Sequence, residues 1–123
     1  MKKLILVLML GLVSIGAFAQ VEWLTAYGVS IRVNGEWSEW EDCNIPIRID
    51  FDNDVITIKT NPPQIYLIVK EVAPPIDGLG EQVAFKVIDQ DRDTGRLRIR
   101  RTYSGVTQIY IDFSNVSIAY LVN

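Results

Sequence analysis

The chain of 123 residues contains no histidine and only one cysteine. Without histidine it cannot form a Ser-His-Asp triad, a Cys-His pair, or a zinc or haem site with histidine ligands. The single cysteine, Cys43, cannot form a disulfide within the chain, so we expect the fold to depend on an apolar core. The neighbouring Glu41 and Asp42 disfavour a thiolate, which favours an inert, buried thiol over a reactive or intermolecular one.

Basic residues are also few, since 12 Lys and Arg stand against 15 Asp and Glu and give a net charge of −3. This balance offers no electrostatic footprint for nucleic acid or for an anionic membrane. With 22% charged and 49% hydrophobic residues, the chain is too apolar to be disordered as a whole. Only carboxylate pairs remain for catalysis, so we expect neither enzymatic activity nor a cofactor.

The N-terminus has the three parts of a secretory signal peptide: two lysines, an apolar run over residues 4–15, and the small-residue triplet Ala17-Phe18-Ala19. The apolar stretch is shorter than the ~20 residues that span a bilayer. We therefore expect cleavage after Ala19, a secreted or periplasmic protein without a stable membrane span, and one domain over residues 20–123.

Beyond the leader, apolar and polar residues alternate with a period of two, as in Ile-Pro-Ile-Arg-Ile-Asp-Phe over residues 45–51. A helical period over ten or more residues is missing, so the pattern predicts an all-β domain. The expected strands lie near residues 21–33, 36–42, 45–51, 54–60, 64–72, 82–89, 96–102, 106–113 and 116–122.

Three turns agree with this alternation: Asp52-Asn53, Tyr103-Ser104-Gly105 and Ser114-Asn115. Each turn brings apolar residues together on one face, which fixes the pairing register. The predicted pairs include Ile49 with Ile56, Leu97 with Ile111, Ile99 with Ile109, and Ile111 with Ile118. The sequence thus predicts an antiparallel meander of about eight or nine strands, closed as a small barrel or packed as a two-sheet sandwich.

Asn34-Gly35 is the strongest short hairpin signal in the chain. A two-residue turn there pairs Trp40 with Val29, which places Trp40 in the core. It pairs Trp37 with Arg32 on the outer face, where the guanidinium can stack on the exposed indole. An exposed tryptophan beside carboxylates can alternatively stack on a sugar.

Arg96, Arg98 and Arg100 share one face of a strand, opposite to Leu97 and Ile99. Three guanidinium groups in a row form a candidate site for phosphate, sulfate or uronate. The alternative is a solvated outer face with cross-strand partners. The predicted partners are Asp112 for Arg96, Tyr110 for Arg98 and Gln108 for Arg100.

Asp89, Asp91 and Asp93 alternate ahead of Gly95. Such spacing resembles the start of a calcium-binding loop, but the twelfth position holds Arg100 in place of a bidentate glutamate. Aspartate and glycine also suit a β-turn through local hydrogen bonds. Calcium binding and a plain hairpin loop are therefore the two interpretations of this segment.

Residues 64–72 are apolar on both faces of the expected strand. If Ile65, Leu67 and Val69 face the core, Tyr66 and Ile68 point outward beside the longest loop, residues 73–81. We expect a binding surface there, to which the loop contributes Pro74, Pro75 and Ile76. Alternatively, the loop folds back over these residues and makes them a second core layer.

The leader ending in Ala-Phe-Ala-Gln, the Gln-Ile-Tyr segments at 64–66 and 108–110, and the closing Tyr120 resemble small secreted proteins of gut-type bacteria. That resemblance implies no particular chemistry. We expect a non-catalytic extracytoplasmic binding or interaction domain, whose partner is a protein or small ligand in the cell envelope or outside the cell. The alternatives are an inhibitor or accessory subunit of a secreted hydrolase, and a small-ligand barrel resembling lipocalins.

Overall fold

The computed structural model describes residues 21–75 and 78–123. The expected signal peptide and Ile76 lie outside the described residues. Within the described part, no helix is long and apolar enough to cross a membrane.

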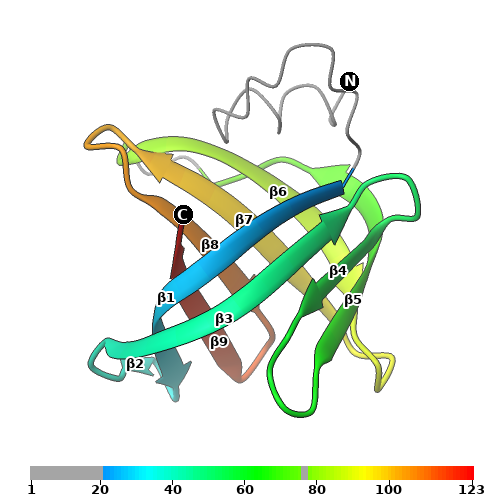
Figure 1. The fold of residues 1–123 in the computed structure, drawn as a ribbon, viewed down its shortest axis with the longest axis horizontal. Helices are drawn as coiled ribbons and strands as arrows, with labels where there is room; N and C mark the ends of the chain where they lie inside the picture. The colour runs from blue at the N-terminus through cyan, green and yellow to red at the C-terminus, as the bar shows by residue number, and fades with distance from the viewer. Residues whose placement is uncertain (1–20, 76–77) are drawn as a thin grey trace.

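Eight antiparallel strands form a closed barrel, and one short strand is added beside it (Figure 1). The neighbours run in the order β1-β3-β4-β5-β6-β7-β8-β9, and β9 pairs with β1 to close the ring. This confirms the all-β meander and decides in favour of a barrel over a sandwich. The strands are β1 (Val21–Val33), β2 (Glu36–Trp37), β3 (Glu41–Asp50), β4 (Val55–Ile58), β5 (Gln64–Val72), β6 (Gly80–Ile88), β7 (Thr94–Thr102), β8 (Thr107–Asp112) and β9 (Val116–Val122).

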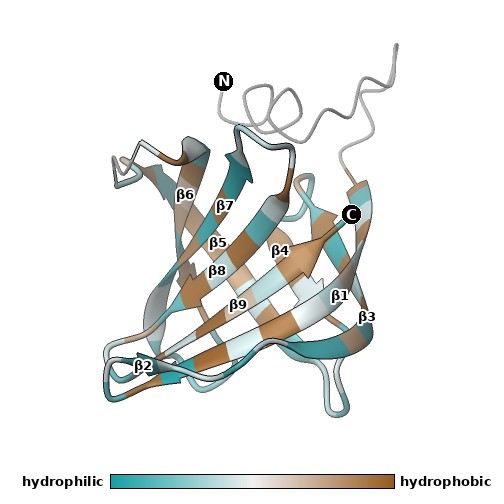
Figure 2. Ribbon diagram, turned by 90° about the vertical axis from the view of Figure 1, so that its left-hand side faces the viewer, coloured by the Kyte–Doolittle hydropathy of each residue, from teal (hydrophilic) through white to brown (hydrophobic). Residues whose placement is uncertain are grey.

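The predicted registers at three turns are confirmed: Ile49 pairs with Ile56, Leu97 with Ile111, and Ile111 with Ile118. The turn between β3 and β4 is longer than predicted, because it includes residues 51–54. Figure 2 shows apolar and polar residues alternating along the strands, as expected when one face lines the interior.

The interior of the barrel is filled by one apolar cluster that includes residues from β1 and β3 to β9. Most residues of the predicted apolar pairs, such as Ile49, Leu97 and Ile111, belong to it, whereas Phe113 and Ile118 are half-buried and pack against it. Cys43 packs against the same cluster as a free thiol, and burial, followed by the charge of Asp42, raises its pKa. The thiol is thus less reactive than an exposed cysteine.

The predicted strand 36–42 is wrong in its length. The Asn34-Gly35 turn forms, with positive φ at both residues, but β2 ends at Trp37. Strand β3 begins at Glu41 and pairs directly with β1, so Val29 lies opposite Glu41 rather than Trp40. This pairing buries several apolar residues of β3, such as Ile47 and Ile49, whereas segment 38–40 has Trp40 as its one apolar side chain.

Two consequences follow from this short hairpin. Trp40 is 46% exposed, so its predicted place in the core is wrong. The loop at 34–40 lies at the same end of the barrel as the β4–β5, β6–β7 and β8–β9 connections (Figure 1), and not at the opposite end as the nine-strand count implied.

The predicted faces of β5 are inverted. Tyr66 and Ile68 are buried, at 5% and 7% exposure, whereas Leu67 and Val69 are 50% and 46% exposed. Tyr66 lies opposite Ile56, a core residue, and cross-strand partners share a face. Its hydroxyl donates to Gln64 Oε1 at 2.7 Å, which gives the buried phenol its partner.

Asp50 fastens the turn between β3 and β4. Its Oδ1 accepts the backbone N–H groups of Asp52 at 3.0 Å and Asn53 at 3.1 Å, and its Oδ2 accepts the Asn53 amide at 2.9 Å. Arg48 Nη1 lies 3.3 Å from the same Oδ2. The bond from the Asn53 side chain, followed by these other contacts, lowers the pKa of Asp50 below its ordinary value of 3.8.

A depressed pKa in the folded state makes this turn sensitive to acid. The stabilisation by Asp50 is complete above the pKa of the unfolded chain and is lost as the pH falls through the lower folded pKa. We therefore expect Asp50→Asn to have a lower melting temperature than wild type near neutral pH, with the difference shrinking below about pH 4. The exposed Asp52→Asn is the control. If the difference stays constant down to about pH 2, Asp50 does not stabilise the turn through its charge.

Candidate functional site

A row of outer-face side chains crosses four neighbouring strands. Ser30 of β1 lies opposite Ala119 of β9, Ala119 opposite Tyr110 of β8, and Tyr110 opposite Arg98 of β7. Ser30 and Ala119 are small and buried, so they form a floor beside the much larger Tyr110. The loop at 34–40 lies beside this floor and contributes Trp37, Ser38 and Trp40.

The floor and its walls enclose a hollow of about 280 Å³ on the outside of the barrel, which we call the aromatic hollow. Trp37 and Trp40 are 43% and 46% exposed. Trp37 meets Tyr110 edge to face, with ring centroids 5.9 Å apart and planes at 83°. The lining residues are Ser30, Trp37, Ser38, Trp40, Gln108, Tyr110 and Ala119.

Serine hydrogen bonds fix the loop against β1. Ser30 Oγ donates to the Ser38 carbonyl oxygen at 2.6 Å, and Ser38 Oγ accepts the N–H of Ile31 at 3.0 Å. The N–H of Ser38 donates back to the Ile31 carbonyl at 2.8 Å. These contacts hold the two tryptophans in place although the segment has no regular strand after Trp37.

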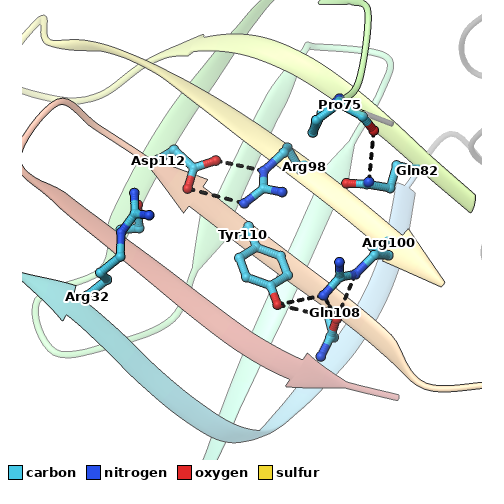
Figure 3. A network of polar contacts seen from close by, with 9 residues as sticks. Arg32, Pro75, Gln82, Arg98, Arg100, Gln108, Tyr110 and Asp112 are labelled. Atoms are coloured by element: carbon cyan, nitrogen blue, oxygen red, sulfur yellow. Dashed lines mark hydrogen bonds and ion pairs between the residues drawn. The ribbon is translucent and has the colours of Figure 1, made fainter. Parts of the chain in front are cut away.

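Two arginines of β7 also contact the Tyr110 ring (Figure 3). The guanidinium carbons of Arg98 and Arg100 lie 4.4 Å and 5.2 Å from the ring centroid. Arg98 Nε also donates to Asp112 Oδ2 at 2.7 Å, and Arg100 Nη2 donates to Gln108 Oε1 at 2.8 Å and to the Tyr110 hydroxyl at 2.9 Å. The predicted cross-strand register is confirmed, but the Asp112 side chain bonds to Arg98 and not to Arg96, which is exposed on the same face.

Arg32 of β1 does not line the hollow itself, but it borders the hollow through its contact with Trp37. Its guanidinium carbon lies 5.5 Å from the Trp37 ring centroid, which confirms the predicted stacking, and its Nη2 donates to Ser117 Oγ at 2.9 Å. Among residues 21–75 and 78–123, no carboxylate lies within 4.0 Å of this guanidinium. Arg32 is thus a half-buried cation without an acidic partner in the described structure.

The structure brings together around Tyr110 two candidates that were separate in the sequence, Trp37 and the arginine stripe. Sequence reasoning assigned Trp40 to the core and did not consider Gln108 and Ser38 as lining residues. The predicted register already placed Tyr110 opposite Arg98, so the sequence could have indicated Tyr110 as part of the site. The position of Trp40 depends on where the loop folds, which no local pattern specifies.

The predicted surface at Tyr66, Ile68 and the following loop does not form as described, since both side chains face the core. Of the loop residues, Pro74 is half-buried and Pro75 is exposed. The Pro75 carbonyl accepts Gln82 Nε2 at 3.0 Å, which ties this part of the loop to β6 (Figure 3).

Of the three aspartates of the β6–β7 turn, Asp89 uses its side chain to bind the backbone of the turn. Asp89 Oδ1 accepts the N–H groups of Asp91 at 2.9 Å and Asp93 at 2.8 Å. In the described part of the chain, no three Asp, Glu or Cys side chains are grouped to hold a metal ion. The structure therefore gives the calcium candidate no support, and the geometry is that of an aspartate-stabilised turn.

Comparisons of the chain with protein-family models, with curated proteins and with solved structures found no match.

Proposed function

We propose that the chain is a non-catalytic extracytoplasmic binding domain whose ligand occupies the aromatic hollow. The observation that carries this proposal is the exposure of Trp37 and Trp40 on a hollow that Tyr110 also lines. Leaving two indole rings in water forgoes a large burial free energy, and such rings are typical of contact sites.

The filled interior supports a ligand on the outside rather than within the barrel. Large apolar side chains such as Phe85, Leu97 and Tyr120 are almost completely buried there and belong to one continuous cluster. A lipocalin-type pocket needs an interior that side chains leave open. The outer hollow therefore suits the binding proposal better than the small-ligand barrel does.

The hollow is also held in shape by the protein itself. The serine bonds between β1 and the loop, and the edge-to-face contact of Trp37 with Tyr110, position the rings before a ligand arrives. A site that is already ordered loses less conformational entropy on binding. This supports recognition by the hollow rather than by the turns at the barrel ends.

A capture experiment tests the proposal. The purified protein is immobilised and exposed to culture medium and envelope extract from the cells that make it, and the bound material is analysed for protein and carbohydrate. We expect Trp37→Ala to abolish specific capture and Trp23→Ala to retain it. Trp23 is the matched control because it is also an exposed indole, at 56% against 43% for Trp37, and it too stacks with cations, Arg48 and Lys59.

If Trp37→Ala captures the same material as wild type, the hollow is not the binding site. Circular dichroism and the melting temperature of each variant show whether a loss of capture reflects a loss of folding.

A further inference from the structure

The charges around the aromatic hollow indicate what kind of ligand it takes, provided that the hollow is the binding site proposed above. We infer that the ligand is an acidic sugar: a pyranose ring that stacks on the exposed tryptophans and carries a carboxylate that pairs with Arg32. The inference depends on the size of the hollow, on its aromatic walls, and on the cations beside them.

The size of the aromatic hollow and the aromatic side chains that line it favour a ligand group with a single ring. The volume of about 280 Å³ lies just below the range of ~300–1,000 Å³ that is usual for small-molecule pockets. Two exposed indoles provide flat apolar surfaces, which match the C–H face of a pyranose. Gln108 Oε1 already accepts from Arg100, so the amide nitrogen of Gln108 is the group that can donate to a hydroxyl of the ligand.

The three cations argue against the other common ligand of aromatic cages, a quaternary ammonium group. Arg98 and Arg100 already stack on Tyr110, and Arg32 stacks on Trp37. A further cation would meet electrostatic repulsion from these guanidinium groups, whereas a negatively charged ligand would not.

Arg32 supplies the reason to expect a negative charge on the sugar. Arg98 is paired with Asp112, but no carboxylate of the described residues lies within 4.0 Å of Arg32. A guanidinium binds a carboxylate through two parallel hydrogen bonds, and it does so most strongly where water is partly excluded. Glu36 and Glu39 of the same loop are exposed and therefore screened by salt, whereas the half-buried Arg32 is screened less.

The test uses calorimetric titration of the purified protein with three uronate oligosaccharides, made of galacturonate, of glucuronate and N-acetylglucosamine, and of mannuronate. Each is compared with its methyl ester, which keeps the rings and removes the charge. We expect at least one uronate to bind, and its methyl ester to bind about tenfold more weakly.

Three variants assign the roles. Arg32→Gln should weaken binding of the uronate about tenfold and leave binding of the ester unchanged, because only the acid uses the guanidinium. Trp37→Ala should weaken both ligands by about tenfold or more, because both use the ring. Lys59→Gln, which removes a cation stacked on Trp23, is the matched control and should change neither.

The inference is overturned if none of the uronates binds, if acid and ester bind equally, or if Arg32→Gln affects both alike. If no uronate binds but Trp37→Ala still abolishes capture of the native ligand, the sugar inference fails and the binding function stands. If Trp37→Ala changes neither uronate binding nor capture, both fail.

Discussion

Replacing Tyr66 and Ile68 together with serine is expected to lower the free energy of unfolding by about 5 kcal/mol or more, which is enough to unfold many domains of this size. Both side chains are buried in the barrel, and Tyr66 also packs against the Phe113 ring, with centroids 6.4 Å apart. The double variant loses two apolar groups, leaves a cavity, and places two hydroxyl groups inside the core.

The matched control lies on the same strand. Leu67→Ser with Val69→Ser removes a similar amount of apolar surface, but both residues are about half exposed on the outside. We expect this pair to cost about 1 kcal/mol or less. Urea denaturation followed by circular dichroism measures both variants, and the opposite order of stability would mean that β5 is in the other register.

Ile111→Ala is expected to cost about 2–5 kcal/mol, the range for a large-to-small change in a packed core. Ile111 is fully buried and lies in a cross-strand row with Ile118 of β9 and Ile31 of β1. Burial declines along this row, and Ile31 is 43% exposed at the end of the barrel.

This row provides the control for Ile111. Ile31→Ala removes the same atoms from a site that water already reaches, so we expect it to cost about 1 kcal/mol. The midpoints of urea denaturation compare the two variants directly. Equal losses would show that the core does not centre on β8.

Much of the barrel could be predicted because turns and alternation agree independently. Where one face of a strand is apolar, as at Ile109 and Ile111, a slip of one residue would expose the whole set, so the register is strongly specified. Residues 64–72 have no such asymmetry, since apolar side chains occupy both faces. There the loop geometry and the pairing of Ile56 with Tyr66 decide the faces, and sequence spacing does not contain that information.

The short hairpin shows a second limit. Asn34-Gly35 predicted its own turn, but not how far the pairing would continue. The long strand β1 is shared between β9, β3 and β2, and closing the barrel favours the partners with more apolar surface. The length of the β1–β2 pairing thus depends on how well distant strands compete for β1, and the local sequence of the hairpin does not contain that information.

The candidate site was predictable in pairs but not as a whole. Hairpin registers gave Trp37 over Arg32, and Tyr110 opposite Arg98, since both depend on local turns. Bringing these pairs together requires β1 to meet β9 across the closed barrel. The floor of the hollow, Ser30 and Ala119, is recognisable only once that contact is known.

The most direct test of the proposed site uses the side-chain N–H signals of the three tryptophans in a ¹⁵N-labelled sample of the purified protein. Trp37 and Trp40 line the aromatic hollow, whereas Trp23 lies nine residues from Arg32 along β1, about 30 Å away in an extended strand. Titration with the uronate oligosaccharides should shift the signals of Trp37 and Trp40 with one common dissociation constant and leave Trp23 in place. Unchanged signals for Trp37 and Trp40, or a shift confined to Trp23, would contradict binding in the hollow.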